Sequence, residues 1–143
     1  MKSINFDVGL KEFMINDDPN RIVKFNPSDY AIITRFNEAQ KEMEVLFAEM
    51  QEKSANASDL EAQSKIIEEV NAKLKASVNK IFAYDIADTV FGDLSPMAMV
   101  NGTPLYVLFI ESAFAEVKEA VDKENKGVEK YTSKYTKKKE TKK

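Results

Sequence analysis

The sequence predicts a mainly helical α+β fold, in which a small N-terminal β-hairpin packs on an antiparallel helical hairpin plus a third helix. One reason is that residues 27–53 and 58–91 form two long amphipathic helical patterns. The other is that residues 3–25 are rich in β-branched and aromatic side chains. With 143 residues, 43% of them hydrophobic, the chain suits one domain with its own core. We expect this domain to span residues 1–125.

Three short segments near the N-terminus have strand-like patterns. Ile4, Phe6 and Val8 alternate with polar residues, and residues 11–15 and 21–25 contain mainly strand-forming side chains. Residues 16–20, between the last two segments, combine proline with Asp and Asn, a composition typical of turns. We therefore expect a hairpin within residues 3–25, in a sheet of two or three strands.

The first helix is expected over residues 27–53, with Asn26 as its N-cap and Pro27 at its first position. Its apolar residues recur at steps of three and four, which favours packing like that of a coiled coil. These residues are Ile32, Ile33, Phe36, Ala39, Met43, Leu46, Phe47 and Met50.

The second helix is expected over residues 58–91, where Ser58 and Glu61 have the spacing of a capping box. Its apolar residues recur every seven positions, which predicts antiparallel pairing with the first helix. These residues are Leu60, Ile67, Leu74 and Ile81, with Val70, Val78 and Phe82 beside them. Beyond Ile81 the pattern is apolar on more than one face. We therefore expect this end to enter the body of the domain and to bend or break near Tyr84.

The C-terminal third divides into a loop, a helix and a tail. Gly92 and Pro96 are expected to end the second helix, and Pro104 to open a third helix over residues 104–123. Residues 126–143 contain eight lysines and two glutamates, a net charge of +6. Because the whole chain carries −3, residues 1–125 carry −9. We expect residues 126–143 to be a flexible lysine-rich tail.

The chain contains no cysteine, histidine or tryptophan. The first two supply most nucleophiles, near-neutral general bases and transition-metal ligands, so we expect no enzyme, no cofactor and no small-molecule substrate. Asp17 and Asp18 lack the spaced ligands of a calcium loop, and Asp85 and Asp88 stand alone as a carboxylate pair. No apolar run approaches the length of a membrane span, and the N-terminus lacks the features of a signal peptide. We expect no membrane partner and a cytoplasmic location.

The remaining role is binding to other proteins, and five residues are candidate partner contacts. Met97 and Met99 lie in the predicted loop, and methionine is common on adaptable binding surfaces. Phe91, Leu105 and Phe109 belong to segments with more apolar residues than one helix face needs. Such surplus apolar surface also makes a homo-oligomer plausible.

One family resemblance gives a specific expectation. Residues 3–120 combine an N-terminal hairpin and two capped helices with a final helix and a series of short motifs. These motifs are Asn26-Pro27-Ser28-Asp29, Ile81-Phe82 followed by Asp85, Val90-Phe91-Gly92, and Leu108-Phe109-Ile110-Glu111. In these features the chain resembles the phage tail assembly chaperones, small proteins encoded ahead of the tape measure protein in phages and prophages of Gram-positive bacteria.

The resemblance implies that the chain binds the tape measure protein and tail subunits during tail assembly, in the host cytoplasm, and is absent from the mature virion. The tape measure protein is a long, amphipathic helical protein that is prone to aggregate before the tail tube encloses it. One alternative is a structural tail or head–tail joining protein that stays in the virion. Another is a small nucleic-acid-binding regulator that acts through Tyr131, Tyr135 and the lysines of the tail, although the negative charge of the body argues against a nucleic-acid partner.

Overall fold

The computed structural model describes the backbone of residues 1–141. It describes the side chains of residues 1–130 and of residue 132. It confirms a mainly helical α+β fold with a small N-terminal antiparallel hairpin. The elements, in chain order, are β1 (Lys11–Ile15), β2 (Asp18–Phe25), α1 (Tyr30–Asn56), α2 (Leu60–Phe82), α3 (Ala87–Phe91), β3 (Met99–Val100), β4 (Thr103–Pro104) and α4 (Leu105–Thr141).

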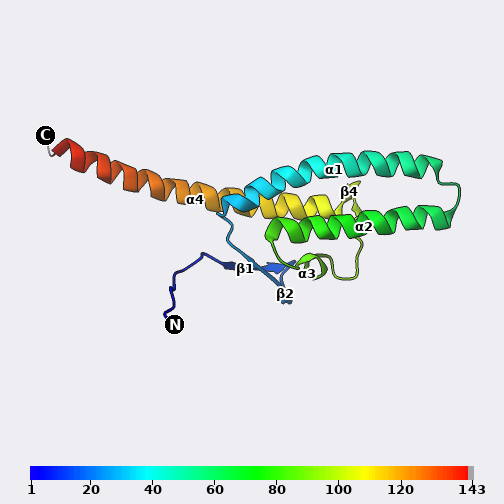
Figure 1. The fold of residues 1–143 in the computed structure, drawn as a ribbon, viewed down its shortest axis with the longest axis horizontal. Coiled ribbons are helices and arrows are strands. Elements are labelled where there is room, and N and C mark those ends of the chain that lie inside the picture. Colours follow the sequence, from blue (N-terminus) through cyan, green and yellow to red (C-terminus); the bar gives the residue numbers. More distant parts are fainter. Residues whose placement is uncertain (142–143) are drawn as a thin grey trace.

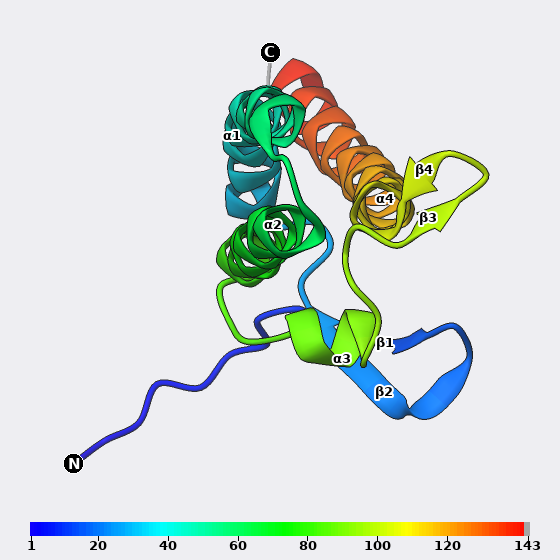
Figure 2. The ribbon, with the colours of Figure 1, turned by 90° about the vertical axis from the view of Figure 1, so that its right-hand side faces the viewer.

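The helices α1 and α2 form a long antiparallel hairpin, and the N-terminal part of α4 lies beside both of them (Figure 1). From there α4 runs away from the tip of the hairpin. The two strands β1 and β2 and the short helix α3 lie together on one side of the helical layer (Figure 2). The core therefore forms where the helical hairpin, α4 and the β-hairpin meet.

Aromatic rings connect these layers, with Phe82 of α2 at the centre. The Phe82 ring lies 4.8 Å from Phe25 of β2, 5.8 Å from Phe36 of α1 and 5.9 Å from Phe109 of α4, between ring centroids. All three distances fall in the range of favourable aromatic pairs. Phe82 thus joins β2, α1 and α4 in one core.

The structure confirms the second and third predicted strands but not the first. The hairpin turns at Asn16 and Asp17, which both have positive φ, as a two-residue type I′ connection requires. Residues 1–10 contain no strand, and Ile4 and Phe6 remain 89% and 76% exposed. Their alternation was a valid strand pattern, but no neighbouring strand pairs with them within the described chain. We call residues 3–8 the N-terminal arm.

Both long helices begin later than the sequence predicted, because a different residue caps each of them. The Asp29 carboxylate accepts a hydrogen bond from the Ala31 N–H, and the Asp59 carboxylate accepts one from the Ala62 N–H. Asn26 instead accepts hydrogen bonds from the backbone N–H and the hydroxyl of Ser28. The predictions of Asn26 and Ser58 as N-caps were therefore wrong, because Asp29 and Asp59 follow them closely in the sequence and cap the helices instead.

The predicted seven-residue seam of α2 is buried only in its second half. Leu74 and Ile81 are completely buried, whereas Leu60 and Ile67 are exposed. The difference follows from the position of α4, which starts beside the middle of α2, so its described residues do not cover the tip. At the tip, Ile66 rather than Ile67 packs towards α1.

The helix predicted over residues 58–91 is interrupted close to Tyr84, as its change of pattern indicated. The helix α2 ends at Phe82, and Ala83 adopts the left-handed conformation. The Asn79 side chain then accepts hydrogen bonds from the N–H groups of Ile86 and Ala87, which starts α3 in a new direction. Gly92, which was expected to end the second helix, ends α3 instead.

The predicted boundary between a helix ending near residue 123 and an irregular tail was wrong. The backbone of α4 remains helical to Thr141. Lysine and glutamate are good helix formers, and residues 124–141 contain no proline. An ion pair between Glu119 and Lys123, which lie one turn apart, stabilises the helix just before this segment. Residues 142 and 143 lie outside the described residues, and the flexibility of residues 126–143 stays a prediction.

The predicted loop over residues 93–103 contains a second, very small hairpin. The strands β3 and β4 are joined by Asn101 and Gly102, which both have positive φ. An Asn-Gly pair is a strong hairpin signal. The sequence reasoning missed it because the flanking strands are only two residues long.

Candidate functional site

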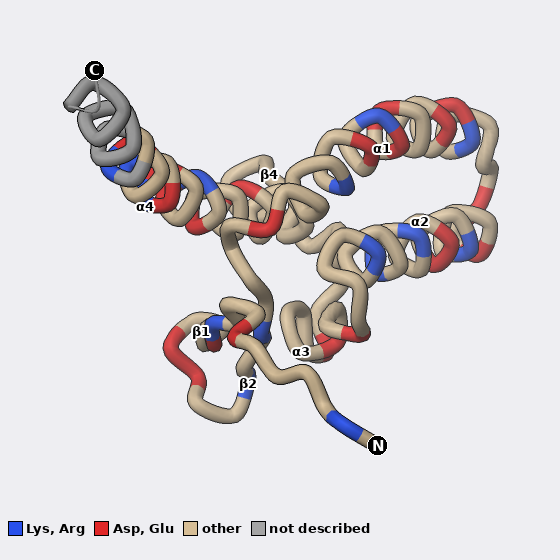
Figure 3. Tube along the Cα trace, turned by 60° about the vertical axis from the view of Figure 1, so that its left-hand side comes forward, with Lys and Arg blue, Asp and Glu red and all other residues tan. Residues whose placement is uncertain are grey.

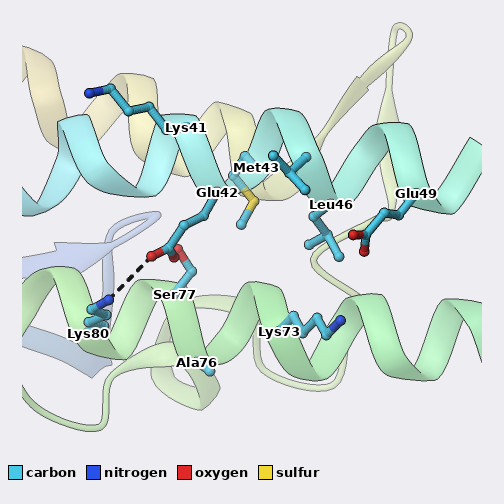
Figure 4. Close-up of a pocket in the computed structure, with 10 residues that line it drawn as sticks. Lys41, Glu42, Met43, Leu46, Glu49, Lys73, Ala76, Ser77 and Lys80 are labelled. Carbon is cyan, nitrogen blue, oxygen red and sulfur yellow. Dashed lines mark hydrogen bonds and ion pairs between the residues drawn. The ribbon is translucent and has the colours of Figure 1, made fainter.

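An apolar groove runs between α1 and α2 on the side of the helical hairpin shown in Figure 4, and we call it the α1–α2 groove. Its volume is about 580 Å³, within the range of pockets that hold ligands. Met43 and Leu46 of α1 point towards α2 and provide apolar surface between the helices, and Ala76 of α2 also lines the groove. Val45 adds a further apolar side chain on the α1 wall and is 59% exposed.

The rims of the α1–α2 groove carry charges of both signs. Lys41, Glu42 and Glu49 come from α1, and Lys73 and Lys80 come from α2. The Lys80 ammonium lies 3.4 Å from the Glu42 carboxylate, an ion pair that spans the groove at one end (Figure 4). Both helices also carry acidic and basic residues along the rest of their length (Figure 3). The groove therefore suits an occupant with an apolar face and mixed charges beside it.

A buried polar pair fixes α4 against α2 at the base of this groove. The hydroxyl groups of Ser77 and Tyr106 lie 3.1 Å apart, and both side chains are buried. Burial raises the pKa of the Tyr106 phenol above its usual value of 10.0; the nearby Glu42 carboxylate adds to the increase and the Ser77 hydrogen bond opposes it. Tyr106 therefore stays neutral at physiological pH and acts as a structural link.

A second groove lies between β1 and α4, and we call it the β1–α4 groove. Its volume is about 410 Å³. Its walls come from β1, β2, the α3 region and α4 and are mostly apolar. The lining residues are Phe13, Met14, Ile15, Asn16, Arg21, Val23, Phe25, Val90, Phe91, Leu94, Leu105, Leu108, Phe109, Ser112, Ala113 and Glu116.

Arg21 holds the α3 wall of the β1–α4 groove in place. Its Nε donates a hydrogen bond to the Thr89 carbonyl at 2.8 Å, and its Nη2 donates one to the Val90 carbonyl. These carbonyls lie at the C-terminal end of α3, where a positive charge is also favourable. Phe91 and Leu94, which line the groove, follow these two residues in the chain. The sequence reasoning gave this residue no role.

The five predicted contact residues are divided between two regions. Phe91 is buried, Leu105 and Phe109 are partly buried, and all three line the β1–α4 groove. Met97 is partly buried against the core, and Met99 is exposed on β3. Neither methionine lines either groove. The sequence analysis missed the α1–α2 groove, although Val45, an apolar residue outside the predicted helix seam, was a signal of it.

The chain contains no cysteine and no histidine, so neither residue lines either groove. Within the described residues, no group of three or more acidic side chains gathers that could hold a metal ion. No described helix is both long enough and apolar enough to cross a membrane. Comparisons of the chain with protein-family models, with curated proteins and with solved structures gave no match.

Proposed function

We propose that this protein is a phage tail assembly chaperone that binds amphipathic helical segments of the tape measure protein in its α1–α2 groove. The observation that carries this proposal is the groove itself, an open apolar channel between two antiparallel helices with charged rims. The motif resemblance over residues 3–120 supports the choice of partner. The lack of cysteine and histidine agrees with a role that requires binding and no chemistry.

The groove fits a helix better than it fits an extended peptide. The residues of the α1 wall, such as Lys41, Val45 and Glu49, are four positions apart and form a straight ridge along the helix. A third helix laid beside two antiparallel helices can insert its own apolar ridge between theirs, as in helix bundles. Recognition of this kind uses apolar anchors at helical spacing on the partner.

The charged rims contribute selectivity for such a partner. Lys41 and Lys73 can meet acidic residues that flank the apolar ridge of a bound helix, and Glu49 can meet basic ones. Because these charges are exposed to solvent, they contribute little affinity and are weakened by salt. The contact is therefore mainly apolar and limited in area, which suits a chaperone that must release its partner when the tail tube assembles.

The proposal places the protein in the host cytoplasm during tail assembly, in contact with the tape measure protein and tail subunits. It performs no catalysis and leaves before the virion is complete. Mass spectrometry of purified virions tests this last point. A chaperone is absent from the particle, whereas a structural tail or head–tail joining protein is present at a fixed copy number.

Co-expression with the tape measure protein of the same genome tests the groove. We expect the wild-type chain to keep the tape measure protein soluble and to co-purify with it. Val45→Glu places a charge in the apolar channel and should abolish both effects. Leu60→Glu is the matched control, because Leu60 is also an exposed apolar residue of the helical hairpin but lies outside the groove. Equal behaviour of the two variants would contradict the assignment of the groove.

A further inference from the structure

The N-terminal arm has the pattern of a strand but pairs with nothing in the described chain. Ile4, Phe6 and Val8 alternate with Ser3, Asn5 and Asp7, so an extended arm has one apolar face and one polar face. The apolar residues are largely exposed, and the arm extends away from the body (Figures 1 and 2). Three exposed apolar side chains on one face of a strand indicate a surface that is buried in an assembly.

The point where the arm leaves the body is fixed by hydrogen bonds. The Asn26 side chain donates to the Val8 carbonyl at 3.0 Å, and the Asp7 carboxylate accepts from the Gly9 N–H at 2.8 Å. Gly9 has a φ of +71°, and a Cβ there would lie 2.8 Å from the Asn26 Nδ2 atom. The turn therefore requires glycine, and it directs the arm away from its own hairpin.

The strand β1 has an open edge of matching length. Lys24 of β2 pairs with Glu12 of β1, and the Lys24 N–H donates to the Tyr84 hydroxyl rather than to β1. Glu12 and Lys24 therefore form a non-hydrogen-bonded pair, so the N–H and C=O groups of Glu12 point away from β2. The same holds for Met14, two residues further along β1. Tyr84 covers the outer edge of β2, whereas no side chain and no backbone group from outside the hairpin forms a hydrogen bond with the backbone of Glu12 or Met14 within the described residues.

The β1–α4 groove lies next to this open edge. Its β1 wall includes Phe13 and Ile15, and its α4 wall includes Leu108 and Phe109. A strand added to β1 with its apolar face towards the core would place its side chains in this groove. The groove carries one positive and one negative side chain, Arg21 and Glu116, and is thus electrically neutral.

We propose that the arm of one copy adds as a third strand to the β1 edge of a second copy, with Ile4, Phe6 and Val8 in the β1–α4 groove, and that two copies exchange arms reciprocally. Main-chain hydrogen bonds to the edge then supply affinity, and the side-chain pockets supply register. The arm carries one charged side chain, Asp7, and Lys2 directly precedes it with the opposite charge. Residues 2–8 are therefore neutral in their charged side chains, like the groove, so docking brings no net side-chain charge into the groove.

The occupant is a second copy because of the direction of the arm and the area that it buries. To reach its own β1 edge, the chain would have to reverse at Gly9 and lose both hydrogen bonds that fix the arm. One docked arm buries on the order of 800 Å² in total, given about 100 Å² for each of the two aliphatic side chains and about 200 Å² for the phenylalanine, with a similar area of groove. Two exchanged arms bury about 1,600 Å², which reaches the size of stable interfaces, whereas one arm does not.

Sedimentation equilibrium of the full chain, from low to high micromolar concentration, tests this proposal. We expect a dimer for the wild type. Phe6→Asp should weaken the dimer by about tenfold or more, because it places a charge in both grooves of each dimer. Asn5→Asp is the matched control, since it adds the same charge on the polar face of the arm and should leave the dimer intact.

Leu94→Asp tests the groove from the other side. Leu94 lines the β1–α4 groove but is 60% exposed, so the variant should melt at the same temperature as Phe6→Asp and lose the dimer to a similar extent. A wild-type chain that is monomeric throughout would overturn the proposal. So would a dimer that Phe6→Asp leaves unchanged, or one that Phe6→Asp weakens and Leu94→Asp does not. The experiment uses this chain alone, so its outcome is separate from binding of the tape measure protein.

Discussion

The clearest energetic prediction compares two positions one heptad apart on α2. Leu74 has 0% of its surface exposed, whereas Ile67 is 48% exposed, although the sequence places both on one seam. We predict that Leu74→Ala lowers the free energy of unfolding by about 3–4 kcal/mol. This includes the lost transfer energy of the removed carbon atoms and the cost of the cavity that remains.

Ile67→Ala removes atoms that are already half in contact with water and leaves an open surface rather than a closed cavity. We therefore predict a loss of about 1 kcal/mol for this variant. At about 3 °C per kcal/mol for a chain of this size, the melting temperature should fall by about 10 °C for Leu74→Ala and about 3 °C for Ile67→Ala.

Urea unfolding followed by far-ultraviolet circular dichroism measures both values. All proteins are compared at one concentration, because self-association also stabilises the fold. A change of midpoint at constant slope identifies a true loss of stability. Equal losses for the two variants would refute the reasoning, because they would mean that the whole seven-residue seam is buried and that the tip of the helical hairpin is covered.

Three further predictions concern caps, a buried hydroxyl pair and the C-terminal segment. Asp59→Ala should cost about 1 kcal/mol and Ser58→Ala almost nothing, since Asp59 caps α2; urea midpoints distinguish them. Tyr106→Phe should cost about 1–2 kcal/mol near neutral pH, because the buried Ser77 hydroxyl loses its partner. Burial raises the pKa of folded Tyr106, so below pH 10.0 the phenol is neutral in both states, and above it the unfolded chain ionises first. The free energy of unfolding of the wild type should therefore exceed that of Tyr106→Phe by less as the pH rises beyond 10.0. Urea unfolding of both proteins near neutral pH and above pH 10.0 checks this. Removing residues 126–143 should leave the thermal midpoint unchanged, because residues 126–130 are fully on the surface; a clear drop in midpoint would mean that α4 beyond this point packs on the body.

The fold class and the positions of most elements could be predicted because each depends on a local pattern. The seam residues of α1 from Phe36 to Leu46 are buried as their spacing indicated. The break near Tyr84 followed from the loss of a single apolar face. The C-terminal extent of α4 was missed because lysine-rich composition was given more weight than helix propensity.

The grooves could not be predicted in the same way, because each is formed by elements far apart in the chain. Phe91, Leu105 and Phe109 were selected for their surplus apolar character, and the structure places all three on one groove with Phe13 and Ile15 of the hairpin. No sequence pattern indicates that β1 and α4 are neighbours. Likewise, the N-terminal arm has the sequence pattern of a strand but forms none, because the turn at Gly9 directs it away from the hairpin.

The central claim is that the α1–α2 groove binds a helix of the tape measure protein, and calorimetric titration tests it most directly. Amphipathic helical segments of the tape measure protein are titrated into the wild type, Val45→Glu and Leu94→Asp. The account predicts measurable affinity for the wild type, a loss of about tenfold or more for Val45→Glu, and wild-type affinity for Leu94→Asp, which alters only the other groove. The claim is contradicted if no segment binds the wild type, or if Val45→Glu binds as tightly as the wild type.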